Sequence, residues 1–168
     1  ELEITALGEF LTESNSNNII GYLGLDKNDL PVLQMTGWMK NDGPSNSAQG
    51  LSYIKDDQAV SPMDNPEEAR FFTMALAGRA KHLSPVVAAE MPKRSSGHLL
   101  DIAGGSGYYT FEWLMVNPGA TATIIDRPEV LTVAREILEH SSEYGASNIK
   151  DRVVFLPGDM LNDHLPKA

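Results

Sequence analysis

The stretch His98-Leu-Leu-Asp-Ile-Ala-Gly-Gly-Ser-Gly107 decides the fold. It begins with a short apolar run, which predicts a buried strand over residues 98–103. Gly104, Gly105 and Gly107 then predict a tight turn, because a residue without Cβ can take a positive φ and lie close to a ligand. Residues 108–116 predict a helix, whose first N–H groups are free to bind a carboxylate or a phosphate.

The same alternation continues downstream. Residues 121–126 and 152–157 predict two further strands, and residues 128–144 predict a helix that stops at Gly145. The apolar residues of that helix recur at the spacing of an amphipathic stripe: Val130, Ala134, Ile137 and Leu138. The order strand-helix-strand-helix-strand predicts parallel strands with right-handed crossovers, and therefore an α/β fold with an open parallel sheet.

Residues 1–65 are polar and predict only short helices, over 6–12, 17–25 and 31–40, with a polar loop over 41–50. A stronger helix begins at Asn65-Pro66-Glu67-Glu68, where Asn65 can cap the first turn and Pro66 needs no N–H donor. It runs to about residue 91, either as two helices separated at Ser84-Pro85 or as one kinked helix. Phe72 and Met74 on this helix are expected in the core. The chain thus divides into a helical segment, 1–65, and an α/β segment, 66–168.

Composition narrows the function. The 168 residues contain 13 Lys plus Arg against 23 Asp plus Glu, a net charge of −10, with 42% hydrophobic and 21% charged residues. These values are typical of a globular chain, and an acidic surface disfavours nucleic acid and anionic membranes. The absence of cysteine excludes a disulfide framework, a thiolate metal site and a cysteine nucleophile, and it fits a reducing, cytoplasmic location. No apolar run has the length of a membrane helix, and no signal peptide is evident. The first residue is not Met, and from this we expect an excised or processed piece.

Three carboxylates follow or end the three predicted strands. Ligands of open α/β sheets bind at the carboxyl ends of the strands, so Asp101, Asp126 and Asp159 are expected to meet there. Asp101 favours a cationic amino group, Asp126 can accept from ribose hydroxyls, and Asp159 can accept from an exocyclic amine while Met160 packs on a flat base. Each feature alone has a structural alternative: the glycines can form a plain turn, Asp126 can be an acid at a helix start, and Asp159 can be a turn aspartate. Their coincidence at three successive strand ends favours a site.

Two other functions stay open at this point. A nicotinamide-dependent oxidoreductase would use Asp126 in the same way, but its G-x-G-x-x-G/A loop requires a small residue where Thr110 stands. Asp101 would also repel a pyrophosphate. A non-catalytic module of the same fold, which binds a partner, is the third hypothesis.

The combined motifs resemble one family. Asp101-Ile-Ala-Gly-Gly-Ser-Gly107 is similar to the D-x-G-G-G-x-G loop of S-adenosylmethionine-dependent methyltransferases. Asp126-Arg-Pro-Glu-Val130 and the segment from Arg152 to Met160 resemble the D-L-P-x-V and R-V-x-x-x-x-G-D-M-F segments of plant-type O-methyltransferases, a family with bacterial members. The resemblance implies a Rossmann-like class I methyltransferase domain that binds S-adenosylmethionine.

The resemblance also implies residue roles. Asp101, Ala103, Gly104, Gly105 and Gly107 would hold the methionine moiety, Asp126 and Arg127 would lie at the ribose, and Asp159 and Met160 would lie at the adenine. Ala103 stands where the family has its first Gly, Arg127 where it has Leu, and Leu161 where it has Phe.

The implied reaction is methyl transfer to a hydroxyl of a small molecule, including an aromatic one, by a homodimeric enzyme. The family's general-base His lies in an H-D-W motif, and none of His82, His98, His140 and His164 lies in such a motif, so no catalytic or metal-binding residue is nominated. The expectation is therefore a fragment that ends before the fourth strand and is inactive alone. Three strands without their further neighbours should leave an unpaired sheet edge and an uncovered apolar face, which predicts that the chain pairs with a second molecule or belongs to a longer protein.

Overall fold

The computed structural model describes residues 3–24, 30–41, 62–145 and 148–166. In chain order its elements are η1 (Gly8–Leu11), α1 (Ile20–Leu23), α2 (Leu30–Asn41), η3 (Pro62–Asp64), α3 (Pro66–Glu90), β1 (Gly97–Ile102), α4 (Tyr108–Val116), β2 (Ala120–Asp126), α5 (Pro128–His140), α6 (Ser142–Gly145), η4 (Ile149–Arg152) and β3 (Val153–Pro157). Except for Asn41, the loop predicted over 41–50 lies outside the described residues.

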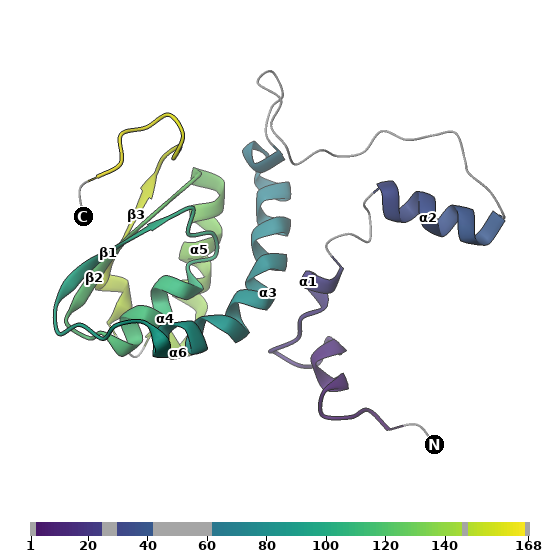
Figure 1. Cartoon of the computed structure of the whole chain (residues 1–168), viewed down its shortest axis with the longest axis horizontal. Helices are drawn as coiled ribbons and strands as arrows, with labels where there is room; N and C mark the ends of the chain where they lie inside the picture. Colours follow the sequence, from purple (N-terminus) through teal and green to yellow (C-terminus); the bar gives the residue numbers. More distant parts are fainter. Residues whose placement is uncertain (1–2, 25–29, 42–61, 146–147, 167–168) are drawn as a thin grey trace.

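The three strands form one parallel sheet in the order β1-β2-β3. Its register pairs Ile102 with Ile125 and Asp126 with Pro157, so the carboxyl ends of all three strands lie along one edge (Figure 1). The α/β fold with a parallel sheet is therefore confirmed. The strands begin or end within one residue of the predicted positions.

Helices α4, α5 and α6 pack on one face of this sheet. The buried cluster there combines alternate residues of β2 with aromatic and aliphatic side chains of the helices: Ala120, Ala122, Ile124, Phe111, Trp113, Leu114, Leu131, Leu138, Tyr144 and Ile149. The predicted stripe of α5 faces this core, since Val130, Ala134 and Leu138 are buried and Ile137 is half-buried. On the opposite face Ile102, Val154 and Leu156 are exposed among the described residues, as expected for a sheet face without its cover.

Helix α3 begins as predicted. The Asn65 Oδ1 accepts hydrogen bonds from the backbone N–H groups of Glu67 (2.9 Å) and Glu68 (3.4 Å), and Pro66 occupies the first turn. The helix continues through Pro85 to Glu90 as one element. Of the two possibilities that the sequence left open, the continuous helix is the observed one.

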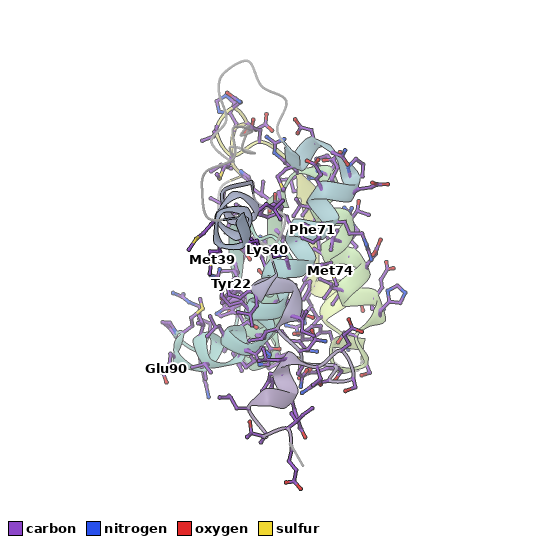
Figure 2. The ribbon with its side chains drawn as sticks, turned by 90° about the vertical axis from the view of Figure 1, so that its right-hand side faces the viewer. Tyr22, Met39, Lys40, Phe71, Met74 and Glu90 are labelled. Carbon is purple, nitrogen blue, oxygen red and sulfur yellow. The ribbon has the colours of Figure 1, made fainter. Side chains whose placement is uncertain are left out.

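The expectation that Met74 lies in the core is wrong, because its side chain is 45% exposed. Phe72 is half-buried, and Phe71 and Met74 project from the face of α3 that Figure 2 turns to the viewer. The buried positions of α3 carry small side chains instead: Ala69, Thr73, Ala75, Ala77, Ala80, Ser84 and Ala88. Small residues allow α3 to approach α1, α4 and α5 closely, and larger side chains such as Phe71 and Met74 stay exposed.

Two predicted helices are shorter than expected, and one is divided. In the described residues of these segments, 6–12 and 17–24, the helices are η1 and α1, each four residues long, whereas α2 matches its prediction. The helix predicted over 128–144 breaks at Ser141, whose ψ is 121°. The Ser141 Oγ accepts a hydrogen bond from the N–H of Tyr144 (3.3 Å), so this serine starts α6 rather than continuing α5. No helix in the described ranges is long and apolar enough to span a membrane.

Candidate functional site

A cavity of about 120 Å³ lies where the three strands end. Its lining comes from the end of every strand: Ala103, Ile125, Asp126, Arg127, Gly158, Asp159, Met160 and Leu161. The structure thus brings together five of the nine predicted site residues, namely Ala103, Asp126, Arg127, Asp159 and Met160. Of the other four, Asp101 lies near the end of β1, and Gly104, Gly105 and Gly107 belong to the β1–α4 turn beside the cavity.

The β1–α4 turn requires its glycines for different reasons. A Cβ on Gly104 would lie 2.7 Å from the Ile124 Cγ2, and a Cβ on Gly107 would lie 2.5 Å from the Phe111 Cζ. Gly105 and Gly107 have φ values of +58° and +80°, which favour glycine. A Cβ on Gly105 would meet no atom within 4 Å, so the turn presents an open surface at that residue.

Asp126 joins the ends of the strands. Its Oδ2 accepts a hydrogen bond from the N–H of Gly105 (2.8 Å) and its Oδ1 accepts from the N–H of Arg127 (2.8 Å). The Asp126 carbonyl accepts from the N–H of Gly158 (3.0 Å), at the end of β3. A carboxylate has about four acceptor positions, so two bonds fix its orientation and leave capacity for a diol.

Asp101 is held behind the glycine turn. Its Oδ2 accepts a hydrogen bond from the Thr110 hydroxyl (2.5 Å). Burial raises the pKa of the Asp101 carboxyl; the Thr110 hydrogen bond lowers it and the negative charge of Asp126 raises it further. The sequence pattern did not predict this hydrogen bond of Thr110. A signal was present, because Thr110 stands where a dinucleotide-binding loop has a small residue. A cationic ligand group here would relieve the repulsion between the two carboxylates.

Asp159 forms part of its own turn. Its Oδ1 accepts from the N–H of Leu161 (2.9 Å) and its Oδ2 accepts from the Asn162 side-chain amide (2.8 Å). The turn role that the sequence allowed is therefore present, and a contact with an exocyclic amine stays a prediction. Met160 is 52% exposed at the mouth of the cavity.

Arg127 forms an ion pair with Asp64, the last residue of η3. The arginine side chain is 26% exposed, and it borders both the strand-end cavity and a neighbouring hollow of about 460 Å³. Asp64, Pro128 and Pro157 also line that hollow. The sequence gives no signal for Asp64, because the contact joins segments far apart in the chain.

The histidines lie elsewhere. His82 Nε2 lies 2.8 Å from the Asn17 carbonyl, and the ring nitrogens of His98 lie 2.8 Å and 3.0 Å from the hydroxyls of Thr121 and Thr123. In the described part of the chain, no group of three or more His, Asp or Glu side chains could hold a metal ion.

A parallel sheet with a glycine turn after β1 and carboxylates at its strand ends defines a nucleoside-binding α/β domain. Comparison with protein families makes this specific: residues 39–168 match the O-methyltransferase domain, and the chain belongs to that family. The resemblance seen in the sequence is thereby confirmed, and the oxidoreductase alternative is not supported.

Known proteins agree with this assignment. The chain is 34% identical over 70 residues to acetylserotonin O-methyltransferase of Gallus gallus, a stretch that covers 42% of this chain and 18% of that enzyme. It is similar in structure to an O-methyltransferase family 2 protein of Planctomyces limnophilus, solved in complex with apigenin, at 32% identity and a TM-score of 0.56 over 96% of this chain and 44% of that one. Human N-acetylserotonin methyltransferase, solved in complex with SAM, shares the fold at 21% identity and a TM-score of 0.63, over 96% of this chain and 45% of its own. The chain thus spans less than half the length of these relatives.

Proposed function

We propose that the protein carrying this chain transfers the methyl group of S-adenosylmethionine to a hydroxyl of a small molecule. The observation that supports this most is the cavity shared by the three strand ends, with Asp126 fixed in its wall by the N–H groups of Gly105 and Arg127. Family membership supplies the class of reaction.

The residues at the strand ends fit this cofactor. Asp126 retains acceptor capacity for the two ribose hydroxyls. Ile125, Met160 and Leu161 offer apolar surface for the adenine, and the open surface at Gly105 allows a ligand to lie against the backbone. Asp101, a partly buried carboxyl near another carboxylate, suits the cationic amino group. When bound, S-adenosylmethionine supplies an electrophilic methyl group.

This chain binds and orients the cofactor. The glycine turn and Asp126 fix the position of the donor, which contributes to rate by proximity and orientation. We nominate no general base among the described residues, so we expect this chain alone to bind the cofactor without turnover. Any transfer of methyl from S-adenosylmethionine to an acceptor by the isolated chain would contradict that expectation.

The acceptor is proposed to be a small hydroxylated molecule, including an aromatic one. The relative solved with apigenin supports this class. We further propose a homodimer with residues 1–65 on the acceptor side, and a cytoplasmic location for a cysteine-free chain. The exposed apolar side chains of α2 and α3, such as Met39, Phe71 and Met74, support an interface in that region (Figure 2).

Calorimetric titration with S-adenosylhomocysteine and with NAD tests the proposal. The expected result is binding of S-adenosylhomocysteine alone, weakened about 10- to 100-fold by Asp126→Asn, because two hydrogen bonds to a charged acceptor become weaker. Asp151→Asn, an exposed acid on η4 outside the cavity, is the matched control and should bind as the parent does. Binding of NAD alone, or an unchanged affinity in a folded Asp126→Asn variant, would overturn the proposal.

A further inference from the structure

The ion pair between Asp64 and Arg127 links two parts of the molecule with different tasks. Asp64 ends η3 and immediately precedes the capping residue of α3, whereas Arg127 starts α5 at the end of β2. Within the described ranges, one other ion pair joins the α3 region to the α5 region, between Arg70 and Glu136. Neither of these two residues lines the strand-end cavity. The Asp64–Arg127 pair is therefore the one that combines the α3–α5 connection with the candidate cofactor site.

Arg127 forms the boundary between two hollows. Its side chain lines the strand-end cavity and also the 460 Å³ hollow that Asp64 borders. A long cationic side chain keeps its charged head group in contact with water and lays its aliphatic stem along apolar surface. Asp64 lines the neighbouring hollow and not the strand-end cavity, so the ion pair directs the Arg127 guanidinium toward that hollow.

Arg127 is also coupled to the ribose acceptor. Its backbone N–H donates to the Asp126 Oδ1 at 2.8 Å, so a change in the Arg127 backbone would alter one of the bonds that orient the Asp126 carboxylate. The position of Asp64 is thereby transmitted to Asp126 through one residue. The coupling is reciprocal. A ligand that fixes Asp126 and Arg127 must stabilise the Asp64–Arg127 ion pair by the same free energy by which the ion pair favours the ligand.

From these contacts we infer that Asp64 is a positioning residue for the cofactor: it orients Arg127, whose stem then forms one wall of the adenosine pocket. This inference rests on the proposed function. It has two consequences, that cofactor affinity depends on salt through the ion pair, and that cofactor binding stabilises the start of α3.

A double-mutant cycle on the natural polypeptide that carries this sequence tests the inference. S-adenosylhomocysteine is the probe, because it lacks the sulfonium charge, and the comparison is always between the parent and its variants with this same ligand. Asp64→Asn should weaken its binding about fivefold, which corresponds to the roughly 1 kcal/mol that a partly exposed ion pair contributes at most. In an Arg127→Leu background the same Asp64→Asn change should have no effect, since no guanidinium remains to be oriented.

Two further readouts separate positioning from a general loss of stability. Raising NaCl from about 0.05 M to about 0.5 M should weaken binding by the parent more than binding by Asp64→Asn, and equal weakening of both would contradict the role of the ion pair. The ligand should slow amide exchange over residues 62–68 in the parent and not in Arg127→Leu. Glu136→Gln removes the other α3–α5 ion pair and should preserve the affinity.

The failures are distinguishable. If the parent does not bind S-adenosylhomocysteine, the proposed function fails. If the parent binds but Asp64→Asn has the same effect with and without Arg127, or if Glu136→Gln weakens binding equally, the positioning role of Asp64 is wrong while the cofactor site stands.

Discussion

Gly107 is the residue of the β1–α4 turn with the least room for a side chain. Its φ is +80°, and a Cβ would lie 2.5 Å from the Cζ of Phe111. Phe111 cannot swing aside, because it is fully buried and its ring packs against those of Tyr144 (centroids 5.3 Å apart) and Phe155 (6.5 Å). We therefore predict that Gly107→Ala strongly destabilises the fold.

Two costs add in this substitution. A non-glycine residue in the left-handed region costs about 1–2 kcal/mol. Overpacking of a filled core costs about 1–3 kcal/mol more. The lower chain entropy of alanine in the unfolded state returns about 0.4–1 kcal/mol, so the expected loss is about 1–5 kcal/mol in the free energy of unfolding.

Gly105→Ala isolates the packing cost. Gly105 has a φ of +58° but no atom within 4 Å of the added Cβ, so only the conformational cost applies. Urea denaturation followed by the fluorescence of the buried Trp113 measures both variants in the same way. Gly107→Ala should be less stable than Gly105→Ala by the packing term. Equal stabilities would refute the view that Phe111 closes this side of the turn.

Three further changes have predictable effects. Ala103 has a φ of +58° in the same turn, so Ala103→Gly should raise the free energy of unfolding by about 0.5–1 kcal/mol, the relief of strain less the entropy of glycine; a loss of stability in urea would contradict this. Ser84 is fully buried and its hydroxyl has no hydrogen-bond partner among the described residues, so Ser84→Ala should raise the thermal midpoint through a gain of about 1 kcal/mol, whereas Ser84→Val should not. The pKa of Asp101 is raised from 3.8, so its ionisation destabilises the folded chain as pH rises through that raised value. Asp101→Asn should therefore be more stable than the parent at neutral pH, and this difference in stability should vanish below about pH 3.8. A difference that stays constant across a pH series would show that the buried charge of Asp101 does not cause it.

The α/β half of the chain was predictable because its signals are local. The change from the 3.6-residue period of a helix to a short apolar run marks each strand, and Asn65 caps α3 through N–H groups only two and three residues away. The meeting of Ala103, Asp126 and Asp159 was also predictable, since parallel strands bring their carboxyl ends to one edge.

Two of the errors arise from contacts between distant segments, and one arises from a local hydrogen bond. Met74 was expected inside because size and hydropathy alone do not show which face of a helix must approach its neighbours closely. The break at Ser141 depends on a serine hydroxyl that competes with the next helical hydrogen bond. Asp64 had no signal at all, because its partner Arg127 lies near it only after folding.

The row of small residues on α3 has a consequence for how this sequence can change during evolution. Small side chains at its buried positions let α3 lie close to α1, α4 and α5, so a larger side chain on the side of α4 and α5 would widen the gap to that layer. The start of α3 is attached to Asp64, so a widened gap also draws that carboxylate away from Arg127. Natural variants in this row should therefore reveal themselves first as altered ligand affinity, while the sheet and its core remain intact.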